Sequence, residues 1–177
     1  MNIILISGKA HSGKGTVGRK IENILNNQGK HVIRCSLSTY IREIAKNDFY
    51  WDGIDTLESR IFMGEVYRIG TEFYPYHMAR RVWERDIKPY ANKNTTVIVE
   101  SFRELVNYDY FNILLKEGLI DEISTIRIIR PKFNSIQNEE FEKHVSESDL
   151  DDFEFDYIVE NDGSIEELDN KLKEMFN

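Results

Sequence analysis

The stretch Ile6-Ser7-Gly8-Lys9-Ala10-His11-Ser12-Gly13-Lys14-Gly15-Thr16 decides the fold of this chain. It follows the apolar run Ile3-Ile4-Leu5-Ile6, which predicts a buried strand, and it precedes a segment with helical spacing. Gly8 and Gly13 let the backbone curl so that successive N–H groups point at an anion, and Lys14 adds a mobile positive charge. The positive dipole end of the following helix faces the same point. The stretch therefore predicts a phosphate-binding loop.

The composition is that of one globular domain. A chain of 177 residues can bury one sizeable core and is short for two. Its single cysteine, Cys35, ends an apolar run, so we interpret it as a small buried residue. We find neither a secretory leader pattern nor an apolar run of bilayer length, and we therefore expect a cytoplasmic protein without membrane contact.

Charge is distributed unevenly along the chain. The formal net charge is −8, but residues 139–177 hold 15 acidic and 3 basic residues, which leaves 16 acidic and 20 basic residues before them. A mildly basic body with a phosphate loop suits small anionic substrates. The acidic tail argues against nucleic-acid binding there and is typical of a solvated surface.

Apolar runs alternate with helical patterns, which favours an α/β fold with a parallel sheet. The predicted strands cover residues 2–7, 31–35, 95–99, 123–129 and 155–159. The predicted helices cover residues 14–25, 38–46, 56–69, 75–90, 104–116 and 164–176. We expect Gly70-Thr71-Glu72 to break the chain between two helices, and Ser164 with Glu167 to form a capping box.

Two arginines stand out by their positions. At helical spacing Arg80 lies among Tyr76, Ala79, Trp83 and Ile87, and an arginine in an apolar stripe needs an anionic partner. Arg103 follows the third strand, close behind Glu100. Binding groups in open α/β sheets gather at the carboxyl ends of the strands, so we expect both Glu100 and Arg103 at the site.

The loop ending Gly13-Lys14-Gly15-Thr16 is similar to that of nucleoside monophosphate kinases. Beyond the loop, the chain resembles most closely the deoxynucleoside monophosphate kinase family common in bacteriophages. The resemblance spans nearly the whole chain, although each motif outside the loop is short. The matching segments are Arg42-Glu43-Ile44-Ala45, Asp48-Phe49, Trp51-Asp52-Gly53, Gly70-Thr71-Glu72, Arg103, Ile129-Arg130-Pro131, Phe155-Asp156-Tyr157 and Asn161-Asp162-Gly163.

This resemblance implies a three-layer P-loop kinase fold. Its five-stranded parallel sheet has the order 2-3-1-4-5 and is flanked by helices. A single domain, 1–177, would contain an acceptor-binding helical insert at 38–92 and a lid-like segment at 131–153. The implied reaction transfers the γ-phosphate of ATP to a (deoxy)nucleoside monophosphate with Mg²⁺. The implied partners are small nucleotides, and monomer and homodimer both stay open.

The resemblance also implies roles for individual residues. Lys14, Arg103, Arg130 and Glu100 would be catalytic, and Thr16 and Glu100 would hold the metal, directly or through water. Lys132 would close over ATP together with Arg130. The implied ATP-binding residues are Gly8, His11, Ser12, Gly13, Lys14, Gly15, Thr16, Arg130, Asn161 and Gly163. The implied acceptor-binding residues are Arg42, Arg80, Arg103, Trp51 and Glu72.

Several residues keep a structural interpretation beside the functional one. Glu100 and Arg103 can form an ion pair at a strand end, Arg42 can lie on the surface, and His11 can be a variable loop tip. The aromatic residues Trp51 and Tyr74-Pro75-Tyr76 suit either base stacking or core packing. A solvated basic stripe accounts for Arg60, Gly64 and Arg68, which share one helical face.

Two other functions stay open. The family's third strand usually ends in aspartate where this chain has Glu100. If Glu100 is a general base, the acceptor is a hydroxyl group, as in deoxynucleoside kinases. A nucleotide-binding sensor with low turnover is the other alternative. We find neither an Asn-Lys-x-Asp motif nor a DxxG switch after a strand, which argues against a guanine-nucleotide switch.

Overall fold

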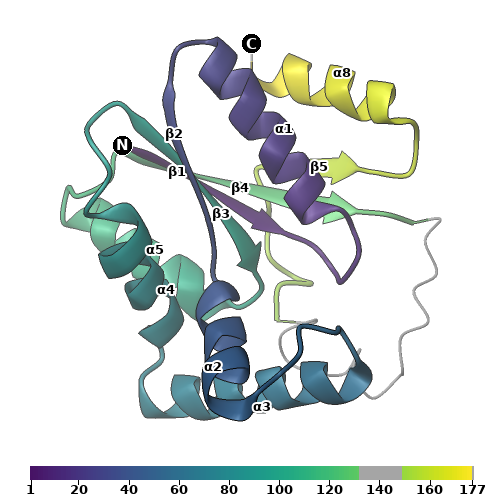
Figure 1. The fold of residues 1–177 in the computed structure, drawn as a ribbon. Coiled ribbons are helices and arrows are strands. Elements are labelled where there is room, and N and C mark those ends of the chain that lie inside the picture. The colour runs from purple at the N-terminus through teal and green to yellow at the C-terminus, as the bar shows by residue number, and fades with distance from the viewer. Residues whose placement is uncertain (132–148, 177) are drawn as a thin grey trace.

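The computed structural model describes residues 1–131 and 149–176, which form a parallel sheet with helices on both faces (Figure 1). Most of the predicted lid-like segment, including Lys132, lies outside the described residues. Within the described residues, no helix is long and apolar enough to cross a lipid bilayer.

All five predicted strands are present, and every neighbouring pair is parallel. The sheet order is β2-β3-β1-β4-β5, which confirms the expected fold. The second and third strands run further than predicted, so Glu100 lies inside β3 and Arg103 directly follows it. The strands are β1 (Asn2–Ser7), β2 (His31–Ser36), β3 (Thr95–Phe102), β4 (Glu122–Ile129) and β5 (Tyr157–Glu160).

Figure 1 shows α1 and α8 on one face of the sheet and α4 and α5 on the other, with α2 and α3 beyond the carboxyl ends of β2 and β3. This arrangement leaves the carboxyl ends of the strands facing α2 and α3. The helices are α1 (Lys14–Asn27), α2 (Thr39–Phe49), α3 (Leu57–Phe73), α4 (His77–Val82), the π-helical segment η1 (Trp83–Ile87), α5 (Leu105–Lys116) and α8 (Ile165–Phe176).

Strand β1 separates two apolar cores because its side chains alternate between the faces of the sheet. Ile3 and Leu5 belong to the core under α4, η1 and α5, whereas Ile4 and Ile6 belong to the core under α1 and α8. All four side chains are buried. Burial on both faces explains the uninterrupted apolar run, and it fixes the start of the phosphate loop in the middle of the sheet.

The predicted break at Gly70-Thr71-Glu72 is wrong, since α3 continues to Phe73. Gly70 serves a packing role, because a Cβ at this position would lie 2.5 Å from His77 Nε2. Helix α3 begins where the sequence predicts, with Thr56 as its N-cap residue. Thr56 and Ser59 form a reciprocal capping box, with N···O distances of 3.2 and 3.0 Å.

The predicted place of Arg80 within the apolar stripe is also wrong, because Arg80 is exposed, whereas Ala79 and Trp83 of that stripe are buried. The buried face of α4 is centred on Met78, Ala79 and Val82, so Arg80 points away from it. Its guanidinium lies beside Tyr74, with a distance of 3.4 Å to the hydroxyl and of 5.7 Å to the ring centre. Arg80 therefore needs no buried anion.

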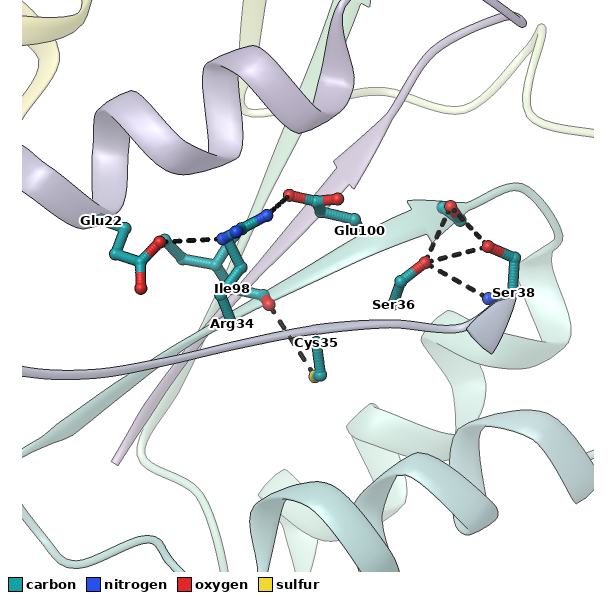
Figure 2. Close-up of polar contacts among 8 residues, drawn as sticks. Glu22, Arg34, Cys35, Ser36, Ser38, Ile98 and Glu100 are labelled. Atoms are coloured by element: carbon teal, nitrogen blue, oxygen red, sulfur yellow. Dashed lines mark hydrogen bonds and ion pairs between the residues drawn. The ribbon is translucent and has the colours of Figure 1, made fainter. Parts of the chain in front are cut away.

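Cys35 is partly buried and packs against the core under α4, η1 and α5, so its predicted burial is confirmed in part. Its Sγ lies 3.8 Å from the carbonyl oxygen of Ile98 in the neighbouring strand (Figure 2). Burial raises the pKa of the Cys35 thiol to about 12, so the thiolate is not populated near neutral pH.

Candidate active site

The loop between β1 and α1 is held against the neighbouring strands. Gly8 and Gly13 have φ angles of +150° and +96°. A Cβ at Gly8 would lie 2.5 Å from the carbonyl oxygen of Ile128, and one at Gly13 would overlap the amide of Asn161. Both glycines therefore allow a close approach that a side chain would block.

The polar groups of this loop are bonded to the protein backbone. Lys14 Nζ donates to the carbonyl oxygens of Gly8 at 2.6 Å and Lys9 at 2.7 Å. Asn161, just after β5, donates from Nδ2 to the carbonyl oxygen of Ser12 at 2.8 Å. The ammonium group of Lys14 is thus placed across the loop, where a bound phosphate would replace its carbonyl partners.

Other predicted ATP-binding residues surround this loop. Gly15 lies in the first turn of α1 beside the exposed Thr16, and Gly163 lies in the turn before α8. That turn contains the predicted capping box, in which Ser164 N donates to Glu167 Oε2 at 2.7 Å. Arg130 is exposed directly after β4.

Glu100 lies in a chain of charges beside α1 (Figure 2). Arg34 Nη1 is 3.0 Å from Glu100 Oε1, and Arg34 Nε is 2.8 Å from Glu22 Oε2. The ion pair that Glu100 forms is therefore with Arg34 of β2. Its carboxylate also packs on α1, since a Cβ at Gly15 would lie 3.8 Å from Oε2 and a Cβ at Gly18 would overlap Oε1.

A cavity of about 290 Å³ lies between the phosphate loop and the helices α2 and α3. Its size is that of a small-molecule site. Three arginines from different elements line it: Arg42 from α2, Arg60 from α3 and Arg103 after β3. The remaining lining residues are Ala10, His11, Lys14, Leu37, Ser38, Ile41, Asp55, Met63, Gly64, Tyr67, Ser101, Glu104 and Asn107.

Arg60 connects α3 with the phosphate loop. Its guanidinium binds both carboxylate oxygens of Asp55, at 2.7 and 2.8 Å, and its Nη2 is 2.7 Å from Nε2 of His11. The hydrogen bond from Arg60 holds the pKa of Asp55 below its usual range. Since an arginine can only donate, His11 Nε2 is the acceptor in this contact.

A group of serines lies where β2 and β3 end. Ser36 Oγ is 3.0 Å from both Ser38 Oγ and Ser101 Oγ (Figure 2). Ser101 has a φ of +64°, which is rare for a residue with a side chain. Ser38 and Ser101 also line the cavity, so this edge of the sheet presents hydroxyl groups to it.

Two buried polar side chains, Glu104 and Asn107, form another part of the cavity wall. Glu104 precedes α5 and is 8 % exposed, and Asn107 in the first turn of α5 is 2 % exposed. Asn107 Nδ2 donates to the hydroxyl of Tyr67 at 3.0 Å. Burial, aided by the charge of Asp149, raises the pKa of Glu104 to about 7, while the hydrogen bond from Tyr67 and the charge of Arg103 act in the opposite direction.

Burial also raises the pKa of Tyr67 well above its usual range, and the nearby charge of Glu104 adds to this shift. The Tyr67 hydroxyl therefore keeps its proton at neutral pH and remains a hydrogen-bond donor.

Three predicted acceptor residues are not among those that line the cavity. Arg80 is exposed on α4. Glu72 pairs with Arg68 on the surface of α3 at 2.5 Å. Trp51 follows α2 and donates from its indole nitrogen to the carbonyl oxygen of Ile54 at 2.8 Å. These three residues have local partners of their own, whereas Arg42 and Arg103 line the cavity.

The sequence interpretation missed several cavity residues. Arg60 was assigned to a solvated stripe, and Tyr67, Glu104 and Asn107 were given no role. For Arg60 and Tyr67 the available signal was helical spacing, because both recur with Gly64 on one face of α3.

A magnesium site requires oxygen donors near the phosphate loop. Among residues 1–131 and 149–176, no three His, Cys, Asp or Glu side chains cluster as metal ligands. Mg²⁺ in kinases usually takes one or two protein oxygens and completes its shell with phosphate and water. The Thr16 hydroxyl and the Glu100 carboxylate, both at the start of α1, are oxygen donors of that kind.

No protein-family model matches the chain, and no curated protein matches it in sequence. Solved structures do match. The APS kinase CysC of Mycobacterium tuberculosis in complex with AMPPNP and APS is 13% identical, with a TM-score of 0.52 over 99% of this chain and 95% of that one. The thymidylate kinase of Ehrlichia chaffeensis is 16% identical, with a TM-score of 0.52 over 99% and 98%. With its sheet order and its phosphate loop after β1, the chain has the P-loop kinase fold.

Proposed function

We propose that this protein transfers the γ-phosphate of ATP to a (deoxy)nucleoside monophosphate. The observation that carries the proposal is the cavity, which is lined by Lys14 of the phosphate loop together with Arg42, Arg60 and Arg103. Planar guanidinium groups bind phosphate oxygens in pairs, so three of them suit an acceptor that carries a phosphate of its own.

The proposed reaction requires the chain mainly to align the two substrates and to neutralise negative charge on the phosphates. A monophosphate acceptor presents an oxygen that is already anionic, so no strong base has to remove a proton. The backbone from Gly8 to Thr16 and the Lys14 ammonium would bind the β- and γ-phosphates of ATP. Arg42, Arg60 and Arg103 would hold the acceptor phosphate in line and neutralise charge on the transferred group.

The proposed cofactor is Mg²⁺, held by Thr16 and by Glu100 directly or through water. A bound Mg²⁺ would supply positive charge to the phosphate oxygens. The ion pair with Arg34 holds the Glu100 side chain beside α1, as a metal-positioning carboxylate requires. Asn161 and Arg130 would border the bound ATP, because both follow the carboxyl ends of strands next to the loop.

The hydroxyl-directed alternative needs a carboxylate base in the acceptor space. Glu100 is not among the residues that line the cavity, and its Oε1 is occupied by Arg34. This arrangement argues against Glu100 as that base; the carboxylates that do line the cavity are Asp55, which is paired with Arg60, and Glu104.

The test is an acceptor screen that measures ADP release from ATP and Mg²⁺ with each common nucleoside and nucleoside monophosphate. We expect turnover with at least one monophosphate and none with the nucleosides. Lys14→Ala should lower kcat by about 100- to 1000-fold, the usual effect of removing one charge-stabilising donor. Lys30→Ala, which removes an exposed lysine after α1, is the matched control and should behave as wild type. Turnover with nucleosides alone, or an unaffected Lys14→Ala variant, would refute the proposal.

A further inference from the structure

The group formed by Glu104, Tyr67 and Asn107 has a definite balance of hydrogen-bond donors and acceptors. The Asn107 amide donates to the Tyr67 hydroxyl. The Tyr67 hydroxyl in turn bonds to Glu104 and can only donate to an ionised carboxylate. One N–H of Asn107 and the O–H of Tyr67 therefore both donate to other members of the group.

Besides the second N–H of Asn107, what remains on these three side chains is acceptor capacity. A carboxylate has about four lone-pair sites, and Tyr67 takes one of those on Glu104. Asn107 Oδ1 is buried and accepts no hydrogen bond in the part of the chain that the structure describes. A ligand that satisfies this wall of the cavity must bring N–H or O–H donors.

The position of the group within the cavity is set by α3. Tyr67 follows Arg60 by seven residues, which is two turns or about 10 Å along a helix axis. Arg60 contacts His11 in the phosphate loop, so Tyr67 lies well away from the loop along the same wall. An acceptor whose phosphate binds at the arginines would extend its base toward Glu104, past the apolar side chains of Leu37, Ile41 and Met63.

We propose that Glu104, supported by Tyr67 and Asn107, selects an acceptor base with two adjacent N–H donors, which among the common bases is guanine. This inference rests on the proposed function. Guanine presents N1–H and N2–H side by side, which matches the two oxygens of one carboxylate. Thymine offers a single N–H between two carbonyl groups. Cytosine and adenine place an amino group beside a ring nitrogen that itself needs a donor.

The base preference should depend on pH, because Glu104 changes its protonation state. The group's neighbours are the Tyr67 hydroxyl, Arg103 and Asp149, and the carboxyl titrates near neutral pH. The ionised form accepts both guanine donors. The protonated form donates one hydrogen bond and accepts another, which is the pattern that cytosine and adenine need. Raising the pH through 7 should therefore favour guanine and disfavour the other two bases.

The experiment measures kcat/KM for the guanine, cytosine, adenine and thymine monophosphates between pH 6 and 8. Calorimetric binding of the same four compounds is recorded in parallel. At pH 8 we expect the guanine compound to be preferred at least tenfold, mainly through KM. Glu104→Gln should remove that preference and its pH dependence. Glu117→Gln, an exposed residue at the other end of α5, is the matched control and should change neither.

A second variant separates recognition from folding. Tyr67→Phe removes one hydrogen bond to Glu104 and should shift the midpoint of the pH dependence upward while the guanine preference remains at high pH. Wild-type protein that prefers another base, or a Glu104→Gln variant that keeps the preference, would overturn the inference and leave the proposed function standing. Binding of the guanine compound without turnover of any monophosphate would refute the proposed function instead.

Discussion

The two sides of the candidate site are built in different ways. On the proposed donor side, which comprises β1, the phosphate loop, α1 and the end of β5, Lys14 and Asn161 bond to backbone atoms of the loop. On the proposed acceptor side, which comprises α2, α3 and the first turn of α5, Arg60 and Asn107 bond to other side chains. Helix α1 buries four residues, whereas the 17 residues of α3 include none that is fully buried. The donor side is therefore fixed by the sheet, and the acceptor side depends on a few polar contacts.

Among the variants that test this contrast, we expect Arg60→Ala to have the largest effect on activity. Removing a charged partner of the acceptor phosphate should lower kcat/KM for the acceptor by about 100-fold, since a hydrogen bond to a charged group contributes about 1.5–3 kcal/mol. Arg68→Ala is the matched control, because Arg68 lies two turns further along α3 and pairs on the surface with Glu65 and Glu72. Steady-state kinetics with either substrate varied would reveal the effect. Equal losses in the two variants would show that α3 contributes only its fold.

The next prediction concerns Glu104 and the way in which it makes the stability of the folded protein depend on pH. The usual pKa of a glutamate is 4.5, and that of Glu104 is raised to about 7, so between these values the folded protein holds a proton that the unfolded chain has released. Stability should therefore fall as the pH rises through this window. Glu104→Gln removes the cost of ionising the buried carboxyl and should stabilise the protein by about 2 kcal/mol at pH 8.

Urea unfolding at pH 5, 6, 7 and 8 would measure this difference. The advantage of Glu104→Gln should be small at pH 5 and grow toward pH 8. Parallel stability curves for wild type and variant would mean that Glu104 ionises as an ordinary surface carboxyl.

The smallest effect is expected on the donor side, from Gly18→Ala. The new Cβ would overlap Glu100 Oε1, and the carboxylate must turn away from α1 to admit it. Because the end of a glutamate side chain moves easily, we expect little loss of stability. A displaced charge at the metal position should nevertheless lower kcat by about tenfold, since small misplacements near the reacting groups are costly.

Titration of activity with Mg²⁺ would show whether the loss in Gly18→Ala lies in metal use. Gly29→Ala is an unsuitable control because Gly29 has a φ of +77°. Asn26→Ala, on the exposed side of α1, is the better comparison. A Gly18→Ala variant with wild-type kcat and Mg²⁺ dependence would remove Glu100 from the proposed metal site.

The same contrast explains what the sequence could predict. The phosphate loop and the Ser164 cap depend on short-range spacing, so they were found from residues next to each other. The Gly70 break was wrong because the reason for that glycine is the ring of His77, which the chain brings back after a turn. Arg80 was misplaced because the stripe drawn through Tyr76 and Ile87 left out Met78 and Val82, which are buried.

The cavity wall formed by Tyr67, Glu104 and Asn107 was missed in the sequence for a related reason. In α5 the apolar Leu105 is 41% exposed and the polar Asn107 is buried, so apolar residues alone do not mark the buried face of this helix. A buried asparagine in an otherwise apolar helix face becomes meaningful only beside Tyr67, which is 40 residues away in the chain. Helical spacing can place a residue on a face, but it cannot say which other segment that face meets.

The close fit of Glu100 against Gly18 constrains how this sequence can change over generations. Alanine at position 18 conflicts with the long carboxylate at position 100, and a shorter aspartate there would relieve the conflict. An ancestor could therefore shorten residue 100 first and enlarge residue 18 afterwards, whereas the reverse order passes through an impaired intermediate. Positions 18 and 100 should accordingly covary among relatives of this chain, although 82 residues separate them.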